Sequence, residues 1–66
     1  MIIRLNGQDF PLKEGTSIRQ LLEQLKVNSV MAAVEVNLKV VPKGAQATTY
    51  LQEGDKVEVI RFVGGG

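Results

Sequence analysis

A single amphipathic helix limits the folds that are open to this chain. Residues 18–25 carry apolar side chains at i, i+3, i+4 and i+7, which form one stripe: Ile18, Leu21, Leu22 and Leu25. Ser17 precedes this stripe and Gln20 follows three residues later, which is a capping-box pattern. A helix this short is not stable alone in water. We therefore expect it to lie on a sheet and to end near Lys26, before a break at Asn28-Ser29.

A β-hairpin is predicted ahead of the helix. Residues 2–5 are apolar and mostly branched, and Asn6-Gly7 follows at once. Both turn residues tolerate the positive φ of a type I′ turn, so Asn-Gly is a strong hairpin signal. The return strand spans residues 8–12, and Pro11 near its end places it at the edge of a sheet or at the exit from the strand.

Two further strands are predicted after the helix. Residues 30–36 form the first, with Ala32, Val34 and Val36 on one face. Asn37 marks a turn, and residues 38–41 form a short strand that Pro42 ends.

The segment after Pro42 is predicted to be irregular. We expect a helical turn at residues 45–48, and we expect Tyr50 and Leu51 to anchor the segment to the core. A turn at Glu53-Gly54-Asp55 then leads into the last strand.

The last strand begins at Lys56, is rich in β-branched residues and runs directly into three glycines, Gly64 to Gly66. We expect one domain over residues 1–63 and a flexible tail over residues 64–66. If the last strand lies beside the first, the two are parallel and the helix belongs to the crossover between them. This order predicts an α+β fold of the ubiquitin-like β-grasp type, with a mixed sheet of four to five strands crossed by one main helix.

Composition excludes most kinds of catalytic site. Cysteine and histidine are absent, which removes thiolate metal sites, cysteine nucleophiles and the commonest acid–base side chain. The seven carboxylates form no recognisable motif, and 66 residues leave little room for a substrate cleft. We expect no metal site, no bound cofactor and no enzymatic activity.

Charge and hydropathy indicate which classes of partner the chain binds and where in the cell we expect it. The eight basic residues are dispersed and the net charge is +1, so no basic stripe for nucleic acid is visible. No signal peptide and no membrane-spanning run is recognisable. We expect a cytoplasmic protein that binds neither nucleic acid nor membrane.

The carboxylate of Gly66 is the candidate reactive group. Adenylation by a partner that uses ATP and Mg²⁺ would convert it into a mixed anhydride, and attack by a sulfur donor would leave a thiocarboxylate. Ile60 and Phe62 are predicted to point toward the sheet face that the helix does not cover. They are interpreted either as a docking patch beside the tail or as ordinary exposed apolar residues.

The sequence resembles the ThiS family of sulfur carrier proteins along nearly its whole length. The matching segments are Ile3–Gly7, Gly15–Ser17, Leu21-Leu22, Met31–Asn37, Val40–Pro42, Gly54–Val59 and Phe62–Gly66. The resemblance implies a carrier, monomeric when free, that supplies sulfur for the thiazole ring of thiamin. Its implied partners are a ThiF-type adenylyltransferase, a cysteine desulfurase as sulfur source, and thiazole synthase (ThiG).

By this resemblance Gly65 and Gly66 are the diglycine, with Gly66 modified, and the partner contacts are Ile60, Phe62, Val63 and Gly64. Two alternatives share the expected fold. The small subunit of molybdopterin synthase carries sulfur in the same way, but it is generally longer. The TGS domain is a regulatory or RNA-associated module that needs no terminal diglycine.

Overall fold

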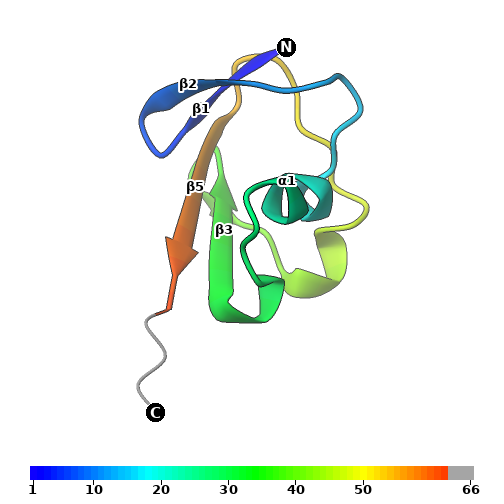
Figure 1. The fold of residues 1–66 in the computed structure, drawn as a ribbon, viewed down its shortest axis with the longest axis vertical. Helices are drawn as coiled ribbons and strands as arrows, with labels where there is room; N and C mark the ends of the chain where they lie inside the picture. Colours follow the sequence, from blue (N-terminus) through cyan, green and yellow to red (C-terminus); the bar gives the residue numbers. More distant parts are fainter. Residues whose placement is uncertain (63–66) are drawn as a thin grey trace.

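The computed structural model describes residues 1–62, which form a mixed sheet crossed by one helix (Figure 1). The five strands lie in the order β2-β1-β5-β3-β4. Their bounds are Ile2–Leu5 for β1, Gln8–Pro11 for β2, Ala32–Val36 for β3, Lys39–Val40 for β4 and Lys56–Arg61 for β5. β5 runs parallel to β1 and antiparallel to β3, and the helix α1 spans Ile18–Gln24. The predicted β-grasp fold is confirmed, while the predicted tail at residues 64–66 lies outside the described residues.

Two hairpin turns set the register of the outer strands. In the β1–β2 turn, Asn6 and Gly7 have φ values of 48° and 83°, as a type I′ turn requires. In the β3–β4 turn, Asn37 and Leu38 have φ values of 52° and 71°. The first turn confirms the Asn-Gly prediction, and it pairs Leu5 with Gln8.

The capping box predicted from the sequence fixes the start of α1. The Gln20 N–H donates to Ser17 Oγ at 3.1 Å, and the Ser17 N–H donates to Gln20 Oε1 at 2.9 Å. Two of the N–H groups that a helix start leaves without partners are thereby satisfied. The Leu51 N–H donates to Thr16 O at 2.9 Å, which ties this helix end to the chain ahead of β5.

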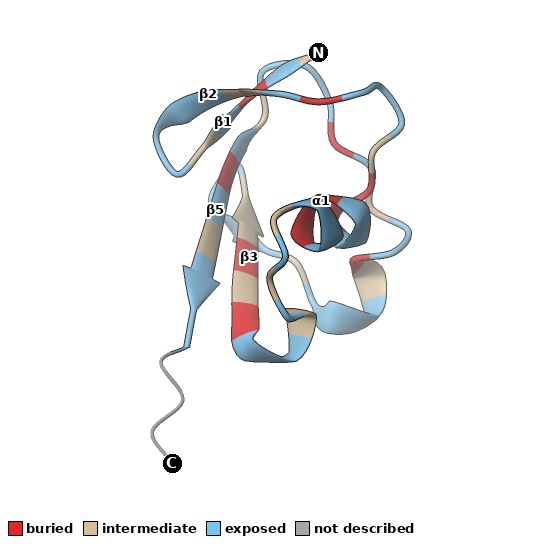
Figure 2. Ribbon diagram, in the orientation of Figure 1, coloured by how far each residue is buried: buried red, intermediate tan, exposed pale blue. Residues whose placement is uncertain are grey.

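The core lies between α1 and the sheet, as the colouring in Figure 2 shows. Its buried side chains come from every layer: Ile3, Leu12, Ile18, Leu21, Leu22, Val34, Leu51 and Val57. The predicted apolar stripe of the helix is confirmed, with Leu25 at its end only partly buried. Burial of this kind is the main stabilising term for so small a domain.

The prediction that the strand begins at Val30 is wrong. Residues Ser29–Met31 form a 3₁₀ turn, η1, and β3 begins only at Ala32. Asn28 caps this turn by accepting a hydrogen bond from the Val30 N–H at 3.0 Å. Lys43 Nζ then donates to the carbonyl oxygens of Ser29 and Val30 at 3.0 and 2.6 Å. The local cap from Asn28 and the more distant contacts from Lys43 together outweigh the strand propensity of the segment.

The prediction for Tyr50 is also wrong, although that for Leu51 is right. Tyr50 is 58% exposed, whereas Leu51 is buried. Tyr50 forms an isolated bridge with Ser17, so the chain is extended here and neighbouring side chains point to opposite sides. The predicted helical turn at 45–48 is observed slightly earlier, as a 3₁₀ turn η2 at Lys43–Ala45.

Candidate functional site

β5 carries the described part of the candidate site. Its side chains alternate between the helix side and the open face of the sheet, the face away from α1. Val57 is buried and Val59 is half-buried on the helix side. Ile60 is 43% exposed and Phe62, just beyond the strand, is 53% exposed. The other predicted site residues, Val63, Gly64, Gly65 and Gly66, lie outside the described residues.

The first half of the open face is charged. Arg4, Glu35, Lys56 and Glu58 line a hollow of about 260 Å³ there. Glu35 lies directly opposite Glu58 in the β3–β5 register. Arg4 also forms an exposed ion pair with Asp9 at 2.9 Å. Such exposed pairs contribute little to stability, so this half favours solvation over docking.

The second half of the open face is apolar. Ala33 lies opposite Ile60. Val40 lies opposite Glu35, at the boundary with the charged half, and it lines one groove with Ala33 and Phe62. We call Ala33, Val40, Ile60 and Phe62 the apolar end of the open face. Val40, which is 66% exposed, was not singled out from the sequence. The β3–β4 pairing brings it to this surface.

A groove of about 180 Å³ continues the apolar end toward η2. Phe62 forms part of its lining, and the rest comes from Ala32, Ala33, Val40, Val41, Pro42, Lys43 and Gln46. Gln46 is buried, and within the described residues its Nε2 has no hydrogen-bond partner. A buried donor without a partner is unfavourable, so this amide carries an energetic cost.

The β5 strand is held in place from the β1 side by Asn6. The Val59 N–H donates to Asn6 Oδ1 at 2.8 Å, and Asn6 Nδ2 donates to Val59 O at 3.4 Å. On the β3 side, the Phe62 N–H donates to Met31 O at 2.8 Å and extends the ladder one residue past β5. The backbone that carries Ile60 and Phe62 is thus fixed up to the last described residue.

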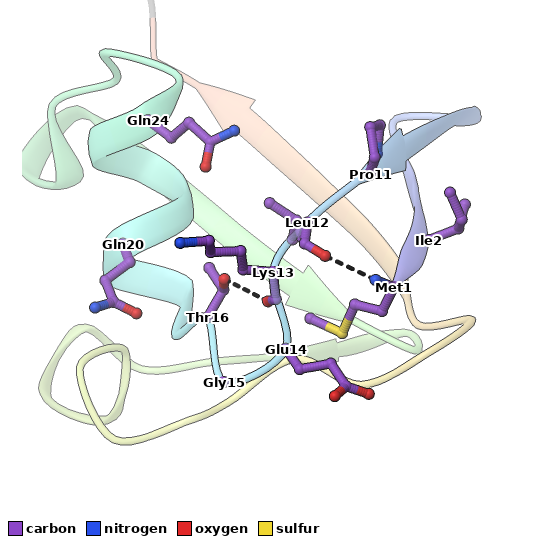
Figure 3. A pocket seen from close by; sticks show the side chains of 10 residues that line it. All are labelled: Met1, Ile2, Pro11, Leu12, Lys13, Glu14, Gly15, Thr16, Gln20 and Gln24. Atoms are coloured by element: carbon purple, nitrogen blue, oxygen red, sulfur yellow. Dashed lines mark hydrogen bonds between the residues drawn. The ribbon is translucent and has the colours of Figure 1, made fainter.

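A larger hollow lies elsewhere, beside the N-terminus (Figure 3). It measures about 640 Å³ and lies between the loop of residues 11–16 and two glutamines of α1, Gln20 and Gln24. Two of its polar groups already have partners: the Met1 ammonium donates to Leu12 O at 2.8 Å and Thr16 Oγ1 donates to Lys13 O at 2.6 Å. These contacts close the loop, and they give the hollow a structural explanation.

Two kinds of feature are not found within residues 1–62. No group of three or more metal-ligating side chains gathers anywhere in this part of the chain. Within the same residues, no helix has the length and apolar character that crossing a membrane requires. The arrangement offers an exposed apolar surface on a fixed strand that leads toward the glycines.

Comparison with known proteins gives this arrangement a family context. A sequence model described as the ThiS family matches residues 3–66. The sulfur carrier protein ThiS of Escherichia coli (strain K12) is 32% identical over 66 residues, which cover all of both chains. The thiazole synthase of Paramagnetospirillum magneticum is 38% identical over 66 residues, which cover all of this chain but 20% of that protein. The chain therefore spans only a fifth of the length of that relative.

A solved structure matches the fold as well. The crystal structure of the thiamine biosynthesis protein ThiS from Geobacter metallireducens superposes with a TM-score of 0.85 and 33% sequence identity. The superposition covers 100% of both chains. The β-grasp fold described here, a five-stranded mixed sheet with one helix, therefore matches that of this ThiS structure.

Proposed function

The chain belongs to the ThiS family of sulfur carrier proteins, and we propose that Gly66 carries the sulfur as a C-terminal thiocarboxylate. The observation that carries this proposal is the family match over residues 3–66, which includes all three terminal glycines. The carrier would deliver its sulfur in the cytoplasm for formation of the thiazole ring of thiamin.

Two steps would form the thiocarboxylate. In the first, a carboxylate oxygen of Gly66 attacks the α-phosphorus of ATP and displaces pyrophosphate, which leaves an acyl adenylate. The activating partner supplies Mg²⁺ and the cationic groups that stabilise the transferred phosphoryl charge. In the second, hydrosulfide attacks the acyl carbon and AMP leaves, so that a C–S bond replaces the C–O bond to the phosphate. Sulfur delivered as a persulfide would instead leave an acyl disulfide, and a thiol would then reduce its S–S bond, forming a disulfide with the donor and releasing the thiocarboxylate. With Gly65 and Gly66 there is no Cβ to obstruct either attack.

The described residues would act by docking rather than by chemistry. Ile60 and Phe62 present apolar side chains next to the glycines, and Val63 and Gly64 would continue the contact. Aromatic side chains such as Phe62 are enriched at the centres of protein interfaces. Asn6 and Met31 hold the strand on both sides, so the backbone up to Phe62 is already ordered. Binding would therefore lose little conformational entropy in this part of the chain.

Three partners follow from this proposal: a ThiF-type adenylyltransferase, a cysteine desulfurase that supplies the sulfur, and thiazole synthase as acceptor. Support for the acceptor comes from the thiazole synthase of P. magneticum, which contains a segment similar to this whole chain. A carrier-like segment within a thiazole synthase is expected if the two act together.

The test is a loading experiment with intact mass and thiol alkylation as readouts. The chain is incubated with ATP, Mg²⁺, a sulfur source and a ThiF-type adenylyltransferase, then treated with a thiol-selective alkylating agent. We expect one alkylated adduct, and none in a variant that lacks Gly65 and Gly66. Alkylation is needed because exchanging oxygen for sulfur changes the mass by nearly as much as oxidising Met1 or Met31. A truncated variant that is still alkylated, or a full chain that never is, would exclude Gly66 as the carrier.

A further inference from the structure

The β1 side of β5 is covered along only the first half of the strand. β1 pairs with β5 at Lys56 and Val57, and the Asn6 N–H donates to Val57 O at 2.9 Å. Figure 1 shows the β1–β2 hairpin beside the start of β5, with β3 alone flanking the end of the strand. The edge of a sheet is therefore open where the chain approaches the glycines.

A side chain already occupies one position on this edge. Asn6 Oδ1 accepts from the Val59 N–H at 2.8 Å and Asn6 Nδ2 donates to Val59 O at 3.4 Å. A carboxamide presents the same donor and acceptor as a peptide group. Asn6 thus takes the place of a further β1 residue, and it shows that this edge of β5 accepts a peptide-like group.

Arg61 is the next residue on the same edge. In an antiparallel pair, successive residues turn their N–H and C=O groups to opposite sides. The Phe62 N–H donates to Met31 O on the β3 side, so the backbone groups of Arg61 point to the side where Asn6 meets Val59. The β1–β5 register ends at Val57, and within residues 1–62 no other strand lies on this side of Arg61.

Building on the proposed function, we propose that the activating enzyme adds an extended main-chain segment to β5 at Arg61. The added segment accepts a hydrogen bond from the Arg61 N–H and donates one to the Arg61 C=O. Strand addition to an open sheet edge is a recurring way of binding proteins. Here it would hold the backbone immediately before the glycines and so aim Gly66 at the catalytic centre of the enzyme.

Charge indicates which side chains the added segment carries. Arg61 and Lys26 line a groove of about 140 Å³ together with Val27, Asn28, Met31 and Phe62. The ion pair within residues 1–62 is Arg4–Asp9, so neither Arg61 nor Lys26 is paired with a described carboxylate. A residue opposite Arg61 shares its face and meets these two cations. We assign an aspartate or glutamate to that position, with apolar neighbours that meet Ile60 on the open face.

Amide hydrogen exchange of the ¹⁵N-labelled chain tests the backbone contact directly. In the free chain, we expect the Arg61 amide to exchange faster than the Phe62 amide, which is bonded to Met31. Addition of a ThiF-type adenylyltransferase should slow the exchange of Arg61 at least tenfold. An unchanged rate in a formed complex overturns the proposal. The proposal is also overturned if the Arg61 amide of the free chain becomes more protected as the chain concentration rises, because a second copy of the chain would then occupy the edge.

A matched pair of variants separates the backbone from the side chain. Arg61→Ala and Arg61→Pro both lack the guanidinium, but only proline also lacks the N–H. Since β3 does not use that N–H, the proline should leave the β3–β5 ladder intact, which a thermal melt checks. We expect Arg61→Pro to bind the enzyme roughly fivefold more weakly than Arg61→Ala, the effect of one net hydrogen bond. Equal affinities overturn the proposal, and the exchange measurement on the unaltered chain applies even if the proline variant unfolds.

The outcomes also separate this inference from the function on which it rests. If the adenylyltransferase neither binds the unaltered chain nor loads it with sulfur, the proposed function is wrong. The strand addition is then wrong as well, because it depends on that function. If the enzyme loads the chain with sulfur while Arg61 stays unprotected and both variants bind alike, only the strand addition fails.

Discussion

Asn6 in the β1–β2 turn binds the backbone of Val59, 53 positions later in the chain, through a hydrogen bond of 2.8 Å from the Val59 N–H. Asn37 in the β3–β4 turn does the same from the other side, accepting from the Lys56 N–H at 3.0 Å. Each asparagine thus adopts the positive φ of its turn and also holds the strand that leads to the glycines. Position and direction of β5 therefore depend on two turn residues.

Asn6→Gly should destabilise the fold without changing the turn. Glycine adopts the φ of 48° at this position without strain, so the change removes mainly the two side-chain hydrogen bonds to Val59. We expect the free energy of unfolding to fall by about 1 kcal/mol. Urea unfolding followed by circular dichroism measures this difference.

Asn6→Asp is the matched control for that change. Aspartate also tolerates positive φ and keeps the acceptor for the Val59 N–H, but it cannot donate to Val59 O. Its stability should fall between those of Asn6→Gly and the unaltered chain. If Asn6→Gly unfolds at the same urea concentration as the unaltered chain, the Asn6–Val59 contact does not stabilise β5.

Leu38→Gly should stabilise the fold. Leu38 has a φ of 71°, a left-handed backbone conformation that its Cβ makes unfavourable. The residue is 86% exposed, so its side chain buries almost no apolar surface in return. The left-handed conformation is unfavourable for a residue with a Cβ by about 1 to 2 kcal/mol, part of which the greater freedom of glycine in the unfolded chain offsets. We expect a gain of up to about 1 kcal/mol in urea unfolding. Leu38→Ala keeps the Cβ and should show no such gain, and equal effects of the two changes would argue against backbone strain.

Leu22→Ala should act on the core. Leu22 is buried at the centre of the helix stripe, and removing its side chain leaves a cavity between α1 and the sheet. Changes of this kind lower the free energy of unfolding by roughly 2 to 5 kcal/mol, which is a large part of the stability of a small domain. Thermal melting should show a much lower midpoint or no folded baseline. Leu25 lies on the same stripe but is only partly buried, so Leu25→Ala should lower the free energy of unfolding less than Leu22→Ala. A larger loss of stability for Leu25→Ala would contradict the assigned core.

Local signals explain which parts of the fold were predictable. The Asn6-Gly7 turn, the Ser17–Gln20 capping box and the helix stripe each depend on residues close together in sequence. The short amphipathic helix predicted that a sheet covers it, and the parallel β1–β5 pair followed from placing the last strand beside the first. The turn at Ser29–Met31 was not predicted because Lys43, 13 positions after Val30, stabilises it.

The candidate site was only partly predictable for the same reason. Alternation along the last strand predicted that Ile60 and Phe62 point to the other face of the sheet from Val57 and Val59. Both Ile60 and Phe62 are about half exposed in the structure. Their role in docking stays a prediction. Val40 joins them only because β4 pairs with β3, and the open edge at Arg61 exists because β1 ends before it. Neither relationship can be read from neighbouring residues alone.

Phe62→Ala and Ile60→Glu should weaken binding to the adenylyltransferase and to thiazole synthase more than they weaken the fold. Both side chains are about half exposed at the apolar end of the open face, so little core packing depends on them. A central aromatic residue of an interface contributes about 2 kcal/mol or more, and a glutamate at position 60 would bring an unpaired charge into the contact. We therefore expect a loss of affinity of at least roughly tenfold for each enzyme in titration calorimetry.

Tyr50→Ala separates docking from general exposure of apolar residues. Tyr50 is as exposed as Phe62, but it lies beside Ser17 at the start of α1, away from the apolar end of the open face. Its removal should leave both affinities unchanged, while thermal melting of all three variants shows whether each remains folded. If Tyr50→Ala weakens binding as much as Phe62→Ala, the contact surface is not confined to the end of β5. If Phe62→Ala and Ile60→Glu bind as tightly as the unaltered chain, these side chains are ordinary exposed residues, and the backbone edge at Arg61 remains as the candidate contact.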